Sequence, residues 1–217
     1  MIAIIDYGMG NLHSVSKALE RLGCDYVITA EAERLQQADG LLLPGVGAFG
    51  DAWQQLQKLS LDTHIRALAE EGKPLLGICL GMQLLFTSSE EGVPENGTRH
   101  EGLNLLSGHV RRFSGRQESG ETYKVPHMGW NALHIKQPEH PIFRNVDGGY
   151  AYFVHSYYVS EMNTDELLAY TDYDAQVPAV VGRKHIVGMQ FHPEKSSRTG
   201  MQLLNNFVSL CEGVNVP

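Results

Sequence analysis

Residues 75–83 read LLGICLGMQ, an apolar run in which one cysteine, Cys79, stands between two glycines. The part before Cys79 is typical of a buried strand, and residues 82–86 after it are typical of a short helix. A side chain at a sharp strand-to-helix turn needs glycines nearby, because the chain is crowded there. Gly77 and Gly81 lie two residues to either side. The pattern predicts a nucleophile elbow that carries cysteine instead of serine.

The position of Cys79 would also activate it. At the start of a helix, unpaired backbone N–H groups and the helix dipole favour the thiolate over the thiol. A single cysteine in an apolar run is otherwise more often a buried structural residue. The flanking glycines, together with a histidine far along the chain, favour the nucleophile.

Residues 185–194, HIVGMQFHPE, form a second apolar strand that ends in a histidine and a carboxylate. In an extended segment residues two apart face the same way, so Glu194 can accept a hydrogen bond from the ring of His192. Pro193 stiffens the pair. A thiol, an imidazole and a carboxylate that orients the imidazole are the parts of an acyl-transfer triad. We therefore expect Cys79, His192 and Glu194 to be catalytic.

A zinc site is the other chemistry that a His-x-Glu pattern can indicate, because nucleotide deaminases carry it. Those enzymes also carry Pro-Cys-x-x-Cys, which is absent from this sequence, as are His-Glu-x-x-His and paired-cysteine patterns. We expect neither a metal nor a cofactor.

The composition limits the class of protein. The 217 residues, 42% of them hydrophobic, suffice for one domain with a substantial core. The net charge of −8, with Arg111-Arg112 as the only basic cluster, argues against nucleic acid as a partner. Three widely spaced cysteines suit a reducing compartment, and the sequence shows no leader-like start and no run of membrane-spanning length. We expect a single cytoplasmic domain over residues 1–217.

The first half of the sequence alternates apolar strands with amphipathic helices. Strands are expected at 2–5, 26–29, 40–43 and 75–78, and helices at 12–22, 32–37, 52–59, 63–70 and 82–86. This alternation indicates a mostly parallel sheet with helices on both faces. The second half changes to short segments that indicate additional antiparallel strands, at 109–113, 122–125, 132–135, 150–159, 167–171, 179–182 and 186–191, before a closing helix at 196–212.

Residues 45–50, GVGAFG, match the glycine fingerprint of dinucleotide-binding sites. That fingerprint belongs in the first βαβ unit, with an acidic residue about 20 residues later at the end of the second strand. Here Glu70 and Glu71 stand at that distance but end a predicted helix. We therefore do not expect a dinucleotide.

The same glycines suit an oxyanion hole. They follow the strand expected to lie beside the elbow strand, so a backbone N–H of Val46 or Gly47 can approach a developing oxyanion. The N–H of Leu80, directly after the nucleophile, would be the second donor.

Three motifs together, Gly-x-Cys-x-Gly after a strand, an upstream Pro-Gly-x-Gly loop and a late His-Pro-Glu, resemble the class I (triad-type) glutamine amidotransferases over nearly the whole chain. Within that class, four stretches resemble the glutaminase subunits of histidine biosynthesis: 6–12 (DYGMGNL), 126–131 (PHMGWN), 153–157 (FVHSY) and 192–197 (HPEKSS). The resemblance implies a flavodoxin-like α/β fold, glutamine as the substrate and a separate (βα)8-barrel cyclase as the partner. Only 23 residues follow Glu194 and 78 precede Cys79, so we expect the ammonia to be used by another subunit.

The resemblance also implies roles outside the triad. Gln83 lies one helical turn after Cys79 and would bind the substrate. Further glutamine-recognition positions are Glu91, His155, Ser156 and Tyr157. Positions expected to face the partner are Trp130, Tyr152 and Lys195.

Two alternatives remain open. The same parts would serve the glutaminase subunit of another synthase, in the vitamin B6, anthranilate or purine pathway. A cysteine elbow on this scaffold also suits a stand-alone hydrolase or chaperone, which needs neither a glutamine pocket nor a partner.

Overall fold

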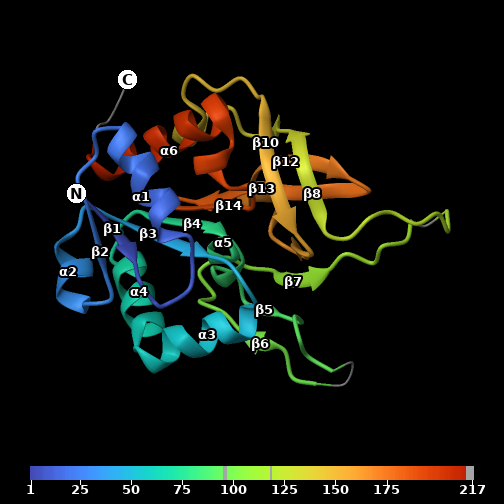
Figure 1. Ribbon diagram of the computed structural model, residues 1–217, viewed down its shortest axis with the longest axis horizontal. Helices are drawn as coiled ribbons and strands as arrows, with labels where there is room; N and C mark the ends of the chain where they lie inside the picture. Colours follow the sequence, from blue (N-terminus) through green and yellow to red (C-terminus); the bar gives the residue numbers. More distant parts are fainter. Residues whose placement is uncertain (95–96, 118, 214–217) are drawn as a thin grey trace.

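A computed structural model describes residues 1–94, 97–117 and 119–213, and it is built around one large sheet (Figure 1). The strand order is β2-β1-β3-β4-β14-β13-β12-β9. The parallel part consists of β1 (Ile2–Ile5), β2 (Tyr26–Thr29), β3 (Gly40–Gly45), β4 (Leu75–Cys79) and β14 (Ile186–Met189). The antiparallel part consists of β13 (Ala175–Arg183), β12 (Leu167–Tyr173) and β9 (His134–Ile135).

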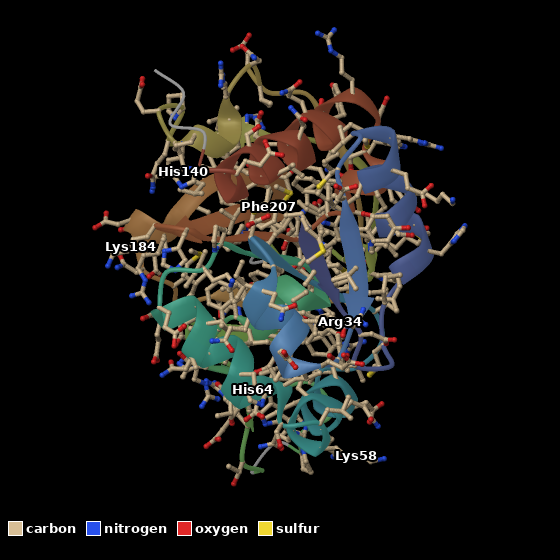
Figure 2. The ribbon with its side chains drawn as sticks, turned by 90° about the vertical axis from the view of Figure 1, so that its left-hand side faces the viewer. Arg34, Lys58, His64, His140, Lys184 and Phe207 are labelled. Carbon is tan, nitrogen blue, oxygen red and sulfur yellow. The ribbon has the colours of Figure 1, made fainter. Side chains whose placement is uncertain are left out.

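Helices cover both faces of the sheet. One face packs against α1 (Leu12–Arg21) and α6 (Ser197–Cys211). The other packs against α2 (Ala32–Gln37), α3 (Phe49–Lys58), α4 (Leu61–Glu70) and α5 (Leu80–Leu84). Figure 2 shows the sheet between α6, which carries Phe207, and α4, which carries His64.

The two cores explain why the parallel strands are apolar throughout. Successive side chains of a strand point to opposite faces, so a strand covered on both sides has no polar face. In β1, Ala3 and Ile5 enter the core under α2 to α4, whereas Ile2 and Ile4 enter the core under α1 and α6. The mostly parallel α/β fold predicted from the sequence is confirmed.

Two smaller sheets lie at the antiparallel side. β8 (His127–Ala132) and β10 (Tyr150–His155) form a two-stranded antiparallel sheet, called here the β8–β10 ribbon. The other has the order β11-β7-β5-β6, with β11 (Tyr157–Ser160), β7 (His109–Arg112), β5 (Ser88–Ser89) and β6 (His100–Glu101). Short 3-10 helices occur at η1 (Pro141–Phe143), η2 (Thr164–Glu166) and η3 (Pro193–Lys195).

Three of the predicted strands are wrong. Residues 122–125 form no strand: only Thr122 makes an isolated bridge, to Arg116, and Tyr123 and Val125 are only partly buried. The single strand expected at 150–159 divides at Ser156 into β10 and β11, which belong to different sheets. The strand expected at 132–135 is also divided: Ala132 ends β8 and residues 134–135 form β9, which belong to different sheets. The remaining expected elements are present, with ends displaced by up to a few residues.

No helix among the residues that the structure describes is long and apolar enough to cross a membrane. Within the same residues, no three His, Cys, Asp or Glu side chains are grouped so that they could hold a metal ion.

Candidate active site

Cys79 lies at a strained turn between β4 and α5. Its backbone has φ 55° and ψ −111°, a combination that non-glycine residues rarely adopt. The glycines leave the room that this turn needs. A Cβ on Gly77 would lie 2.5 Å from the carbonyl oxygen of Gly81, and a Cβ on Gly81 would overlap the carbonyl oxygen of Leu43. The predicted elbow is therefore confirmed as a backbone structure.

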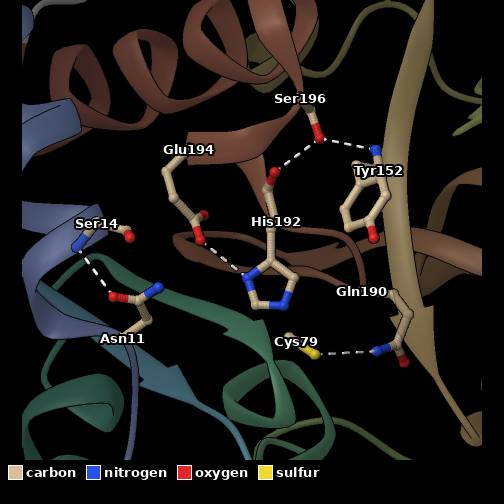
Figure 3. A network of polar contacts seen from close by, with 8 residues as sticks. All are labelled: Asn11, Ser14, Cys79, Tyr152, Gln190, His192, Glu194 and Ser196. Carbon is tan, nitrogen blue, oxygen red and sulfur yellow. Dashed lines mark hydrogen bonds and ion pairs between the residues drawn. The ribbon is translucent and has the colours of Figure 1, made fainter. Parts of the chain in front are cut away.

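His192 follows β14 and lies beside Cys79. Figure 3 shows its ring between Cys79 and Glu194, and Nδ1 is 2.9 Å from Glu194 Oε1. The two side chains are only 5% and 2% exposed. The predicted contact is confirmed, but its expected cause is wrong: the chain is not extended after His192. Residues Pro193–Lys195 form η3, and this turn carries Glu194 back alongside the ring.

The surroundings of His192 favour its protonated form. Burial alone would lower its pKa, but interactions with the Cys79 thiol and the Glu194 carboxylate outweigh burial and raise the pKa to about 9. An imidazolium beside a sulfur atom stabilises a thiolate. The arrangement can therefore deliver both a nucleophile and a proton.

A cavity of about 390 Å³ opens at Cys79 and His192. Its walls bring together ten residues that were predicted for the site, from both halves of the chain: Val46, Gly47, Cys79, Leu80, Gln83, Glu91, His155, Ser156, Tyr157 and His192. Pro126 and Val154 also line it and were not predicted individually. Trp130 (51% exposed) and Lys195 lie on the surface, and Tyr152 is partly buried.

The Pro44–Gly47 segment lies next to the elbow, as predicted. β3 and β4 run parallel with Gly45 opposite Cys79, so Val46 and Gly47 follow directly at the cavity. Gly47 has a φ of +99°, which favours glycine. Gly45 differs from Gly47: it has no positive φ, and a Cβ there would lie 2.7 Å from the Gly81 nitrogen. Gly45 is required by close packing.

Gln83 is more constrained than a surface helix residue. It is 4% exposed, and its Nε2 donates to the Tyr157 carbonyl oxygen at 3.0 Å and to Gln190 Oε1 at 3.1 Å. Both amide hydrogens are thereby used within the protein, which leaves the oxygen for a ligand. Gln190 itself is fully buried, with Nε2 4.0 Å from Cys79 Sγ. The sequence contained a signal for Gln190, since it is the one polar residue in the apolar run before His192.

Two further polar groups complete the cavity wall. Glu91 Oε2 accepts a hydrogen bond from the Phe49 N–H at 2.8 Å, and burial raises the pKa of its carboxyl group. Burial lowers the pKa of His155 to about 3, so this imidazole is neutral, and its Nδ1 lies 2.8 Å from the Tyr157 carbonyl oxygen. His155 Nε2 also lies 3.0 Å from His127 Nδ1, so both ring nitrogens are used within the protein. The site thus offers a ligand one carboxylate beside a neutral ring.

Comparisons with known proteins agree with this geometry. The family model for "Glutamine amidotransferase class-I" matches residues 3–211. The imidazole glycerol phosphate synthase subunit HisH of Geobacillus kaustophilus is 57% identical over 213 residues, 98% of each chain. The protein of the same name from Bacillus subtilis is 53% identical over 210 residues, 97% of this chain and 96% of that one.

Solved structures show the same fold at low sequence identity. A crystal structure of a glutamine amidotransferase has a TM-score of 0.73 and 21% identity, covering 99% of this chain and 100% of that one. The glutaminase domain of Trypanosoma brucei CTPS, solved with bound acivicin, has a TM-score of 0.67 and 18% identity, covering 100% and 95%.

Proposed function

Since the chain belongs to the class I glutamine amidotransferase family, we infer that it is the glutaminase subunit of imidazole glycerol phosphate synthase and functions in histidine biosynthesis. The observation that carries this inference is the identity of 53–57% to relatives of that name, over nearly the full length of both chains. The cavity at Cys79 and His192 supplies the matching chemistry.

In the mechanism that we propose, the Cys79 thiolate attacks the side-chain carboxamide carbon of glutamine. The backbone N–H groups of Leu80 and of Val46 or Gly47 bind the oxyanion that forms. His192 gives its proton to the departing ammonia, which leaves a γ-glutamyl thioester on Cys79. His192 then takes a proton from water, the water oxygen attacks the thioester carbon, and glutamate leaves with regeneration of the thiol.

The remaining cavity residues would hold the amino acid end of glutamine. The Glu91 carboxylate suits an ammonium group, since opposite charges attract strongly in a partly buried site. The Gln83 oxygen can accept a hydrogen bond from the substrate, because its amide hydrogens are held by Tyr157 and Gln190. Residues 155–157 also line the cavity.

The partner in this proposal is a (βα)8-barrel cyclase subunit. It would combine the ammonia with a phosphoribulosyl-aminoimidazole-carboxamide intermediate, giving imidazole glycerol phosphate and an aminoimidazole carboxamide ribonucleotide. The β8–β10 ribbon supports a docking surface beside the cavity, because Met128, Trp130 and Tyr150 are 52%, 51% and 62% exposed on it. β10 also provides Val154 and His155 to the cavity wall.

The proposal is tested by replacing Cys79 in the assembled synthase. We expect Cys79→Ala to abolish synthesis from glutamine and to leave synthesis from added ammonium salts intact, because only the nitrogen source is lost. Cys24→Ala is the matched control, since Cys24 is a partly buried thiol at the far end of the parallel strands, and it should retain both activities. Equal loss of both activities in Cys79→Ala would show that Cys79 is structural.

A second measurement separates the alternatives. The glutamine analogue 6-diazo-5-oxo-norleucine should label Cys79 in the wild-type chain. Labelling without synthesis in the presence of the cyclase would indicate another synthase, and absence of labelling would indicate a hydrolase or chaperone that does not bind glutamine.

A further inference from the structure

A buried serine beside the candidate triad bonds to two elements at once. Ser196 follows η3 and is 0% exposed. Its hydroxyl donates to the His192 carbonyl oxygen at 2.7 Å and accepts the Tyr152 N–H at 2.9 Å (Figure 3). A hydroxyl has one donor and two acceptor positions, so it can serve both groups together. Ser196 therefore joins β10 to the backbone of His192.

The Tyr152 backbone holds His192 a second time. The His192 N–H donates directly to the Tyr152 carbonyl oxygen at 3.2 Å. The backbones of Tyr152 and His192 are thus connected twice. One hydrogen bond is direct, and the other connection runs through the Ser196 hydroxyl, which bonds to the Tyr152 N–H and to the His192 carbonyl oxygen. A shift of β10 at Tyr152 must move the His192 backbone unless one of these bonds breaks.

β10 is connected to the surface of the molecule. It pairs with β8 in the β8–β10 ribbon, which is separate from the central sheet. Trp130 of β8 lies opposite Tyr152, and their ring centroids are 5.9 Å apart. Trp130 is also 51% exposed. The exposed Trp130 ring is therefore connected to His192 in two steps. The first is its aromatic contact with Tyr152, and the second is the set of hydrogen bonds that join Tyr152 and Ser196 to the His192 backbone.

Ser196 has little freedom to move by itself. Its carbonyl oxygen accepts the Gly200 N–H at 3.0 Å at the start of α6. A Cβ on Gly200 would lie 2.6 Å from Ser196 Cβ, which shows how closely the two residues pack. A side chain held in this way transmits a displacement instead of absorbing it.

We propose that Ser196 is a positioning residue that couples the β8–β10 ribbon to His192, so that a partner bound to the ribbon sets the position of the imidazole over Cys79. This proposal rests on the proposed function. It assigns to Ser196 no contact with glutamine, since Ser196 does not line the cavity.

The test compares Ser196→Ala with Ser209→Ala. Both serines donate to the carbonyl oxygen four residues earlier, at 2.7 Å and 3.1 Å, but the bond of Ser209 stays within α6. Glutamine hydrolysis is measured for the chain alone and with saturating cyclase. With the cyclase, Ser196→Ala should lower kcat by about 10- to 100-fold with little change in KM, because a misplaced general acid slows chemistry without altering the pocket. The chain alone should lose less, and Ser209→Ala should behave as wild type.

A double-mutant cycle with Trp130→Ala decides whether the ribbon is involved. If both changes interrupt one connection, the double variant should be no slower than the slower single variant. Losses that multiply, or a loss in Ser196→Ala that is equal with and without the cyclase, would overturn the proposal. If the alanine variant does not fold, Ser196→Cys allows the same comparison, because its slightly larger side chain has the same shape but donates weakly. Wild-type hydrolysis with the cyclase tests the proposed function separately.

Discussion

The Glu194 carboxylate contacts the His192 ring through only one of its two oxygens. Oε1 accepts the ring hydrogen bond at 2.9 Å, whereas Oε2 is buried and has no hydrogen-bond partner in the described part of the chain. Glu194→Gln can keep the bond to Nδ1 and loses mainly the charge. We therefore expect it to be milder than His192→Ala, which should lower kcat/KM for glutamine by about 10²- to 10⁴-fold. Steady-state hydrolysis in the complex measures both, and negligible effects of both changes would remove the triad assignment.

The ionisation of His192 gives a pH prediction. Its pKa is raised to about 9, from an ordinary value of about 6.5. The folded chain therefore binds this proton more tightly than the unfolded chain does. The resulting stabilisation is fully present below about pH 6.5 and is lost as the pH rises through about 9.

Two measurements check this sign. Imidazole resonances followed by NMR should titrate near pH 9 for His192, and Cys79→Ala should lower that midpoint, because the thiol is then missing and burial acts against the charge. The unfolding free energy of wild type relative to His192→Gln should also shrink between about pH 6 and about pH 9. A His192 midpoint at its ordinary value in the wild-type chain would contradict the assigned environment.

Most residues of the cavity could be predicted from motifs, and two kinds of residue could not. Cys79 and His192 were predictable because each follows a predicted strand and has a recognisable neighbour, and Glu194 because it stands two residues after His192. Gln190 was not singled out: it is the one polar residue in its apolar run, but nothing local shows that it faces a sulfur atom 111 positions away. The packing role of Gly45 was not predicted, because sequence cannot tell a glycine needed for its φ from one needed for close packing.

At the scale of elements, β3, β4 and α5 meet backbone against backbone. A Cβ on Gly45 would lie 2.7 Å from the Gly81 nitrogen and 2.9 Å from both Leu80 Cβ and the Tyr7 hydroxyl. We expect Gly45→Ala to lower the unfolding free energy by about 1–3 kcal/mol, the usual range for overpacking, and to reduce activity by displacing the elbow. Urea denaturation measures the first effect.

Gly23→Ala is the control for this experiment. Gly23 has a φ of +69° and nothing within 4 Å of a Cβ, so its replacement is strained only in its backbone and should leave glutaminase activity unchanged. Full activity of Gly45→Ala would show that the elbow tolerates displacement from β3.

The sequence predicted the parallel elements better than the antiparallel ones, for a physical reason. Strands buried on both faces are apolar throughout and end at turns, so their limits are visible. From Ala151 to Val159 the residues at odd positions are buried or partly buried on both sides of Ser156, so nothing local marks the change of sheet there. The change is visible only in three dimensions, where the ring of His155 reaches the Tyr157 carbonyl oxygen across Ser156.

At the scale of the whole molecule, the site lies where the central sheet meets the β8–β10 ribbon. The carboxyl ends of β3, β4 and β14 supply Val46, Cys79 and His192, and β10 supplies His155. The first group was predictable because ligands bind at the carboxyl ends of parallel strands. The separation of the β8–β10 ribbon from the central sheet was not predictable. Because of it, part of the cavity wall belongs to an element whose outer side chains are exposed.

An isolated glutaminase with a permanently formed oxyanion hole would waste glutamine, so we expect control at the Pro44–Gly47 segment. The structure shows which peptide groups of this segment are free to rotate. The Pro44 carbonyl oxygen accepts the Tyr7 hydroxyl at 2.9 Å, and Gly45 is packed against Gly81. Val46 is 42% exposed and Gly47 has a φ of +99°, so rotation is confined to the peptide groups around these two residues.

We predict that the orientation of these peptide groups limits glutamine turnover by the chain without its partner. Without its partner, the segment would point one of its carbonyl groups instead of an N–H toward the oxyanion, and binding of the cyclase and its nucleotide would shift the population to the donor orientation. A missing donor costs about 10²- to 10³-fold in turnover, so the free chain should bind glutamine yet hydrolyse it slowly. Steady-state hydrolysis is compared for the chain alone, with cyclase, and with cyclase plus nucleotide. If the isolated chain hydrolyses glutamine at the rate of the full complex, no oxyanion donor is missing in it. That result would refute regulation by the Pro44–Gly47 segment, even if the triad assignment is right.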